Sequence, residues 1–394
     1  MNAVLMLLGV LIGYFVIRFI YIKKWNKNLD FSVSFEKDHV VAGDMVNLKE
    51  VVTNAKRLPL PFVHIKFQMD RKIEFQNKDA NSSVSDNVYR DDVFSLLFNQ
   101  RITRRIPVTC TKRGVFTIDE VECISSGAFM SDILLMRKKC NSLITVYPKT
   151  VDMSEFQLMN NRICGDLERK KYLLEDKFVF RGIRDYEPFD NMKDINFKAS
   201  AKMGHLMVNE FNETMSEKVC VLLNLENDGM LKFDRLSEES ISIAAGLCES
   251  LIERGINVSL ISNGRDIDGE SLSNSGFGSD VTHLNSINTS LARIDLDNEA
   301  VDFADLLSGI FLNEDMSDLS NESGDLVKWT EDGESDTVYV MISASRRERL
   351  QNVFERLTKG QTETVWVVPH HPGMDYELSY CNIIPRPWEV RNDK

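Results

Sequence analysis

The chain has 394 residues, which is long enough for two or three domains. Of these residues 43% are hydrophobic and 27% are charged, a composition typical of folded proteins. Its net charge of −13 repels phosphate backbones, which argues against nucleic acid as the main partner. The seven cysteines are widely scattered and odd in number, so we expect reduced thiols rather than a disulfide framework, and no zinc site.

The N-terminal segment is the first predicted element, because residues 1–22 are almost entirely apolar and a lysine-rich flank follows them. About 20 helical residues cross the roughly 30 Å hydrocarbon core of a bilayer. Arg18 lies near the end of this segment, where its side chain can reach the same interface as Lys23 and Lys24. Trp25 is expected to supply an aromatic ring at that interface.

A cleaved signal peptide is the alternative interpretation of the same segment. It would need a basic start, a shorter apolar run and a small-residue cleavage site, and the sequence has none of these. We therefore predict a single-pass anchor in the cell membrane, with its basic flank, over residues 1–28. Because basic flanks stay on the cytoplasmic side, the body of the chain is expected there.

The next region, residues 29–150, alternates apolar and polar side chains in short runs that are separated by turn signals. One such turn lies at Ala42, Gly43 and Asp44. Short strands at this spacing predict an antiparallel β-sandwich-like domain. Within it, the polar segment 76–93 is expected to form a long loop.

The C-terminal region, residues 216–394, predicts a doubly wound parallel α/β domain, because continuous apolar runs alternate with amphipathic segments. The predicted strands are residues 218–225, 256–264, 337–345 and 363–371, and the clearest helices are residues 236–255 and 346–360. Residues 264–336 are expected to form an acidic insert. Part of it keeps helical spacing, whereas residues 313–325 are predicted to be a solvated acidic loop or a docking strip for a basic partner.

Between these two regions lies a connector, residues 151–215, whose stretch 180–211 combines many charged and aromatic side chains. Two interpretations stay open for it. The charges could pair with one another and lock the connector to the sheet, or the stretch could be an interaction surface.

The same stretch is similar to the signature of the bacterial domain-of-unknown-function 58 family. The positions that match the family pattern are Gly182, Arg184, Tyr186, Pro188, Asp190, Ile195, Lys198, Ser200 and Ala201. Four positions depart from it: Phe189 replaces a glycine, Lys193 and Lys202 replace arginines, and Phe197 replaces a tryptophan. Segments 112–129 and 146–148 also resemble the family, so the similarity extends over most of the chain from about residue 30.

This resemblance implies three parts: a membrane-anchored N-terminus, a β-sandwich-like domain and a von Willebrand factor A-like α/β domain. It further implies work with a MoxR-type AAA+ ATPase in the assembly or maturation of protein complexes. Von Willebrand A domains bind magnesium through a D-x-S-x-S motif after the first strand. Here Asn224, Glu226 and Asp228 occupy those positions, so the motif is degenerate, although oxygen ligands for a magnesium ion are present.

Three functions follow from the sequence as hypotheses. The first is a non-enzymatic, membrane-tethered protein-interaction module without a cofactor. The second is a metal-dependent ligand-binding or adhesion module that uses the degenerate site. The third is an unrecognised hydrolase, against which the chain has no GxSxG, HExxH or P-loop motif.

Overall fold

The structure is a computed structural model of the chain, which falls into two compact units, Met1–Lys149 and Thr150–Lys394. It describes residues 2–76, 81–84, 87–127, 132–151, 180–187, 192–211, 218–226, 234–269, 272–311, 337–358, 364–372, 377–378 and 383–390. The five cysteines within these ranges are free thiols.

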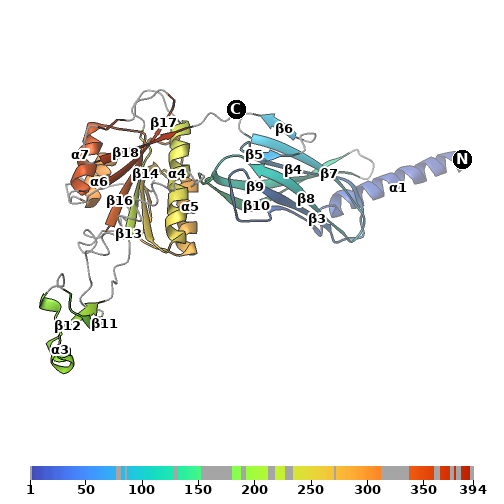
Figure 1. The fold of residues 1–394 in the computed structure, drawn as a ribbon. Helices are drawn as coiled ribbons and strands as arrows, with labels where there is room; N and C mark the ends of the chain where they lie inside the picture. Colours follow the sequence, from blue (N-terminus) through green and yellow to red (C-terminus); the bar gives the residue numbers. More distant parts are fainter. Residues whose placement is uncertain are drawn as a thin grey trace. The chain divides into compact units, whose positions relative to one another are not determined.

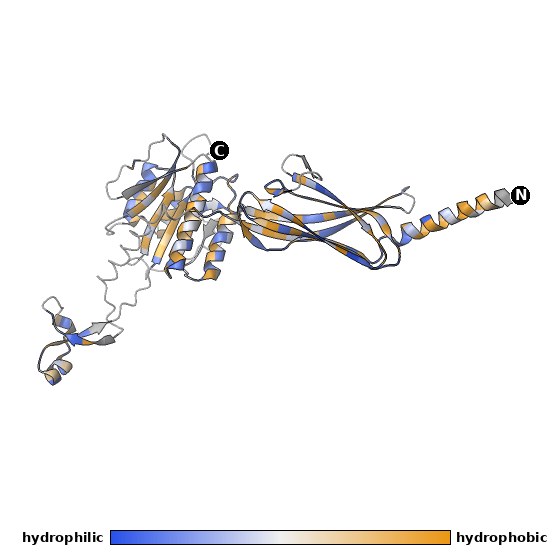
Figure 2. Ribbon diagram, turned by 45° about the vertical axis from the view of Figure 1, so that its right-hand side comes forward, coloured by the Kyte–Doolittle hydropathy of each residue, from blue (hydrophilic) through white to orange (hydrophobic). Residues whose placement is uncertain are grey.

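The first unit begins with helix α1 (Asn2–Lys24), which is apolar along nearly its whole length (Figure 2). Its segment Met6–Lys24 is long and apolar enough to cross a membrane, and only 6% of that segment is buried within the structure. The helix ends in a tight turn, in which Asn28 adopts a left-handed conformation with φ of 53°. That turn leads directly into the first strand.

The body of the first unit consists of two β-sheets that share one hydrophobic core. The strands of the first sheet, in spatial order, are β1 (Leu29–Phe35), β3 (Met45–Asn54), β8 (Gln100–Cys110) and β5 (Ile73–Phe75). Those of the second are β2 (His39–Val41), β10 (Ile133–Tyr147), β9 (Gly114–Ser126), β4 (Leu60–Asp70), β7 (Asn87–Leu96) and β6 (Asn81–Val84). All neighbours are antiparallel except β2 and β10, which run parallel.

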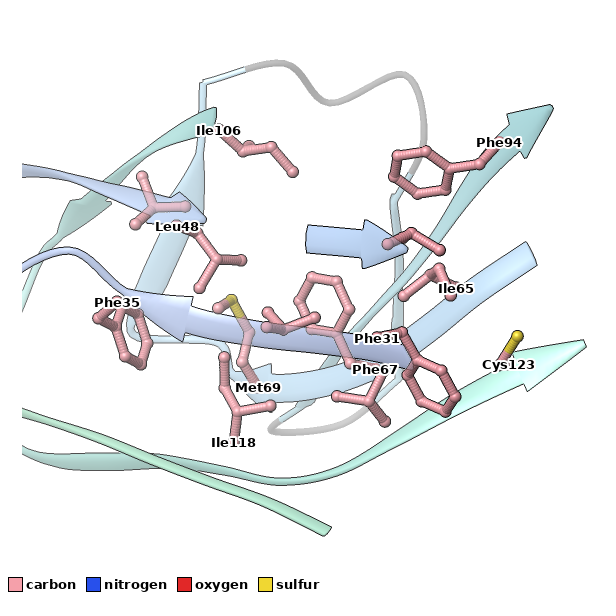
Figure 3. Close-up of a cluster of buried hydrophobic side chains, with 14 of the residues drawn as sticks. Phe31, Phe35, Leu48, Ile65, Phe67, Met69, Phe94, Ile106, Ile118 and Cys123 are labelled. Atoms are coloured by element: carbon pink, nitrogen blue, oxygen red, sulfur yellow. The ribbon is translucent and has the colours of Figure 1, made fainter. Parts of the chain in front are cut away.

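The period-two pattern of the sequence produces this core. In β1 every second residue is buried, and the rings of Phe31 and Phe35 point inward with Leu48 of β3 (Figure 3). Ile65 and Phe67 of β4 meet them from the opposite sheet. The side chains therefore interdigitate between the two sheets, as expected for a β-sandwich.

The long loop that the sequence predicts at 76–93 is wrong, because β6 and most of β7 fall within it. The inward positions of β7 include Arg90 and Asp92, which are buried and ion-paired with each other. Two charged residues at inward positions hide the apolar alternation that would otherwise mark a strand.

These two residues belong to a charge cluster that consists of the buried Glu50, Arg90 and Asp92 and the partly exposed Arg104. Arg104 Nη1 donates to Asp92 Oδ1 at 2.7 Å, and the Arg90 guanidinium lies 4.6 Å from the centre of the Phe75 ring. Glu50 is fully buried in β3, and neither of its carboxylate oxygens has a hydrogen-bond partner. Burial, with the nearby Asp92 carboxylate, raises the pKa of Glu50 above its ordinary value.

The second unit contains a six-stranded sheet with helices on both faces (Figure 1). In spatial order its strands are β15 (Leu272–Asn274), β14 (Asn257–Arg265), β13 (Lys218–Asn224), β16 (Thr337–Ser343), β17 (Thr364–His370) and β18 (Ile383–Glu389). All of them are parallel except β15, which pairs antiparallel with β14.

The helices that cover this sheet divide between two cores. Helices α4 (Asp234–Glu253) and α5 (Val281–Arg293) cover one face of the sheet, and α6 (Phe303–Phe311) and α7 (Glu348–Leu357) cover the other. Strand β13 supplies Val221 to the first core and Leu222 to the second, so it is buried on both faces, as its continuous apolar run predicts.

The expected acidic insert, residues 264–336, is largely part of the folded unit where the structure describes it. Strand β15 extends the sheet, and α5 and α6 pack on its two faces. Phe303 of α6, for example, is completely buried. The predicted acidic loop at 313–325 lies outside the described residues.

Candidate functional site

The carboxyl ends of the parallel strands form the candidate site of the second unit. From β13 the chain continues to β14 on one side, and later returns to β16 on the other side of β13. Strand order therefore reverses between β13 and β16, and ligands of open α/β sheets bind in the crevice at such a point. Asn224 ends β13 and Ser343 ends β16, directly opposite each other.

A network of buried side-chain amides crosses this edge of the sheet. Asn263 of β14 donates from Nδ2 to Asn224 Oδ1 at 2.8 Å, and Asn224 Nδ2 donates to Ser343 Oγ at 3.1 Å. Asn263 Oδ1 also accepts the backbone N–H of Leu225 at 2.8 Å. Because Asn224, Asn263 and Ser343 are at most 2% exposed, these bonds fix the strand ends and the start of the loop that follows β13.

Glu226 lies just beyond this network and is held by the protein through both carboxylate oxygens. Arg347 Nη1 donates to Oε1 at 3.0 Å, and the backbone N–H of Phe303, at the start of α6, donates to Oε2 at 3.3 Å. The Glu226 side chain is only 11% exposed, whereas that of Arg347 is 48% exposed. Burial raises the pKa of Glu226, and the Asp302 carboxylate adds to this, while Phe303 N–H and Arg347 oppose it.

This geometry bears on the three predicted metal ligands. Asn224 and Glu226 do come together, since the Glu226 backbone N–H donates to Asn224 Oδ1 at 2.9 Å, but Asp228 lies outside the described residues. The side-chain oxygens of both placed residues accept protein hydrogen bonds. No cluster of three or more His, Cys, Asp or Glu suitable for a metal occurs within the described ranges.

Sequence reasoning missed the partners that complete this site, Asn263 and Arg347. Asn263 ends the apolar run of a predicted strand, so its place at the sheet edge could have been found by the same argument that found Asn224. Arg347 comes from the loop before α7 and is 121 residues away from Glu226 in the chain. Its pairing depends on β16 lying next to β13, which the sequence alone does not determine.

The signature stretch forms a small unit of its own. Strands β11 (Phe180–Asp185) and β12 (Met207–Phe211) pair antiparallel, and a 3-10 turn, η1 (Met192–Asp194), and helix α3 (Phe197–Met203) lie between them in the chain. Asn196 caps α3, because its Oδ1 accepts the Ala199 N–H at 2.9 Å, and its Nδ2 donates to Asn209 of β12 at 2.7 Å. The helix is thereby attached to the strand pair.

Several signature positions serve this local fold. Ser200 Oγ donates to the Asn196 carbonyl at 2.7 Å and accepts the Met207 N–H at 2.8 Å, and Ile195 is buried against Val208. Gly182 takes part in the β11–β12 register, where a bulge occurs. Among the remaining signature positions, Arg184 donates to the Asp185 carbonyl, and the Tyr186 backbone N–H donates to the Leu206 carbonyl. The exposed positions are Lys193, Lys198, Ala201 and Lys202. Pro188 and Asp190 lie outside the described residues.

The surface of the signature unit carries large apolar side chains. Phe197 and Met192 are each 73% exposed, and Met203 is 62% exposed. Two further exposed residues, Ile183 and Leu206, belong to β11 and to the segment before β12. Helix α3 has no buried residue. The bonds within the unit therefore leave an apolar and lysine-bearing surface on it.

The membrane-flank residues take places that differ in part from the expectation. Trp25 is only 6% exposed and belongs to the sandwich core. Arg18 does not extend freely, because its guanidinium holds both carboxylate oxygens of Asp132, at 2.7 and 2.9 Å. Lys23 and Lys24 are exposed, as expected. Arg18 and Trp25 contact the sandwich because the end of α1 packs on it.

Comparisons with known proteins give little further information. No protein-family model matches the chain. An uncharacterised protein of Bacillus subtilis (strain 168), YeaD, is 22% identical over 254 residues, which are 61% of this chain and 57% of that protein. The chain thus covers little more than half of this relative, whose name states no function.

Several solved structures are similar to part of the chain. A CARDB domain from Pyrococcus furiosus is 12% identical in sequence, with a TM-score of 0.21. The match covers 30% of this chain and 94% of the CARDB chain. A cohesin module of a family 33 glycoside hydrolase from Clostridium perfringens shows 10% identity, covers 29% and 96%, and has the same TM-score. Likeness at this level bears only on a small part of the chain, and we draw nothing about function from it.

Proposed function

We propose that the chain is a non-enzymatic, membrane-tethered protein-interaction module, which works with a MoxR-type AAA+ ATPase in the assembly or maturation of protein complexes. In this proposal α1 is the membrane anchor, the body is cytoplasmic, and the second unit is a von Willebrand A-like domain. The signature unit is the element that the ATPase binds. Its apolar surface is the observation that carries the proposal.

The topology of the second unit supports the von Willebrand A-like assignment. Numbered along the chain, its strands have the order 3-2-1-4-5-6, which is an order of doubly wound folds. The family resemblance of residues 180–211 implies the same domain. At the reversal point, Glu226 is neutralised by Arg347 rather than left as an open cation ligand, which favours a protein-binding role over a metal-dependent one.

The surface of the signature unit supports a protein partner more directly. Phe197, Met192 and Met203 would each gain about 2 kcal/mol on burial, so a partner that covers them has a substantial driving force. Lys198 and Lys202 are exposed one turn apart on the same short helix as Phe197 and would complement an acidic partner surface. Exposed apolar patches with polar rims are typical of interaction sites.

Co-purification tests this proposal. The full-length chain in detergent, co-expressed with a MoxR-type ATPase of the same genome, is expected to retain the ATPase, and Phe197→Asp is expected to lose most of it. Val281→Asp is the matched control, because Val281 is 71% exposed at the start of α5, outside the signature unit. Met203→Asp provides a second variant of the same surface.

Two outcomes would contradict the proposal. Failure of the wild-type chain to retain the ATPase in several detergents would remove the partner, and equal loss with Phe197→Asp and Val281→Asp would remove the docking surface. Hydrogen exchange of the β11–β12 amides in each variant establishes that the signature unit is still folded.

The two other hypotheses stay predictions. A metal-dependent ligand-binding module would show thermal stabilisation by magnesium that disappears in Asp228→Ala and persists in Glu120→Ala. A hydrolase would show turnover that one side-chain substitution abolishes.

A further inference from the structure

One end of the sandwich carries exposed apolar side chains beside the anchor helix. Leu97 and Phe98, in the turn between β7 and β8, are 58% and 63% exposed, and Ile133 and Leu135, at the start of β10, are 85% and 50% exposed. Phe62, near the start of β4, is 42% exposed. We call these five residues the anchor-side rim.

The strand register places the rim at the end where α1 enters. Leu29, which begins β1, pairs with Asn54 at the end of β3, and Asn54 pairs with Gln100 at the start of β8. The β7–β8 turn therefore lies at this end, as does the start of β10, where Ile133 pairs with Ser126 at the end of β9.

Direct contacts tie α1 to the same end. The guanidinium of Arg18 holds Asp132, which immediately precedes Ile133. Tyr21 Oη donates to the Pro59 carbonyl, in the loop before β4, at 2.9 Å. The rim and the helix thus belong to one packed structure.

These contacts set the depth of the rim relative to the apolar surface of α1. That surface continues past Arg18, since Phe19 is 65% exposed, and Ile20 and Ile22 are also exposed. Arg18 precedes Ile22 by four residues, which is a rise of about 6 Å along a helix. Asp132, which pairs with Arg18, therefore lies near the level of Arg18. Along the helix axis, that level is about 6 Å closer to the N-terminus than Ile22, where the exposed apolar surface of the helix ends.

The charge around the rim differs from that of the chain as a whole. Lys23 and Lys24 end the helix, Lys27 lies in the turn that follows, and Arg57 and Arg101 are exposed beside the loops of this end. Within the described part of those loops, residues 55–59, 97–99 and 132, the one acidic side chain is Asp132, which is paired with Arg18. Of the turns of the opposite end, at 42–44, 70–72 and 111–113, the last two also carry basic residues, and Val41 and Met45 beside the first of these turns are exposed.

We propose that the anchor-side rim lies in the headgroup region of the bilayer that α1 crosses, so that the sandwich rests directly on the membrane. Phe98 and Ile133 enter the boundary between headgroups and acyl chains, and the surrounding basic residues meet lipid phosphates. This inference rests on the proposed role of α1 as a membrane anchor. The chain leaves the sandwich at Tyr147, the far end of the 15-residue strand β10.

Site-specific photo-crosslinking to lipid tests the proposal in the full chain. p-Benzoylphenylalanine is placed singly at Phe98, Ile133, Phe15 or Met45, and each protein is reconstituted in nanodiscs of phosphatidylethanolamine and phosphatidylglycerol. Mass spectrometry of the irradiated protein measures the fraction with a lipid adduct. Phe15 reports on the anchor, and Met45, which is 61% exposed at the opposite end of the sandwich, is the background control.

We expect adduct fractions at Phe98 and Ile133 that approach the Phe15 value and exceed the Met45 value several-fold. Adducts at Phe15 with background values at both rim positions would overturn the rim proposal and leave the anchor intact. Background values at all four positions would overturn the anchor as well.

Discussion

Stability of the sandwich is expected to fall as the pH rises, because of Glu50. This carboxyl is fully buried, its oxygens have no hydrogen-bond partner, and it faces the Asp92 carboxylate. Burial, assisted by Asp92, raises the pKa of Glu50 from 4.5 to about 8. The folded state therefore keeps a proton between these values, whereas the unfolded state releases it.

The sign and size of the effect follow from linkage. A carboxyl whose pKa is raised by folding costs no stability below pH 4.5, and the cost grows as the pH rises towards 8. Each pKa unit corresponds to about 1.4 kcal/mol, so the cost reaches on the order of a few kcal/mol as the pH passes the raised pKa. Glu50→Gln removes the titrating group and is expected to stabilise the sandwich increasingly as the pH rises.

Calorimetric unfolding of the full chain between pH 5 and pH 9 measures this difference. Glu50→Gln should raise the melting temperature of the sandwich transition by on the order of 10 °C at pH 8 and by much less at pH 5. Glu120→Gln, at an exposed position of β9, is the control and should follow the wild type. Parallel pH profiles for the wild type and Glu50→Gln would refute the reasoning.

Three further substitutions test the second unit. Gly264→Ala places a Cβ 2.8 and 2.9 Å from two buried aliphatic side chains, so we expect about 1–3 kcal/mol of destabilisation by urea unfolding, and none for Gly276→Ala, where no atom lies within 4 Å. Asn263→Ala leaves buried backbone and side-chain groups unpaired and should cost about 2–4 kcal/mol; a loss under about 1 kcal/mol would mean that the amide network is dispensable. Ser200→Ala should speed hydrogen exchange at the Met207 amide without changing the melting of the large sheet.

Much of the fold could be predicted from local pattern. The continuous apolar runs of the second unit predict strands that are buried on both faces, and β13, β14, β16 and β17 are present at those positions. The apolar N-terminal segment is helical, as predicted. These patterns are readable because burial on a strand or helix depends mainly on the period of the apolar residues.

The differences from the sequence prediction have a common physical cause. Contacts between residues far apart in the chain decide where a charged or aromatic side chain lies, and a local sequence pattern does not contain these contacts. Arg90 and Asp92 form an ion pair inside the sandwich. Strand β7 therefore has charged residues at buried positions, and its sequence resembles that of a loop. Trp25 directly follows the apolar helix, and its side chain is buried in the sandwich core. Arg347 completes the Glu226 site only because two strands far apart in the chain are neighbours in the sheet.

The affinity of the ATPase for the full chain in nanodiscs tests the central claim most directly. Titration with a purified MoxR-type ATPase, followed by biolayer interferometry, should show saturable binding to the wild type and to Val281→Asp. Phe197→Asp should weaken that binding at least tenfold, since the loss of one buried aromatic side chain corresponds to more than 1.4 kcal/mol. Equal dissociation constants for all three proteins, or no binding by the wild type, would contradict the account.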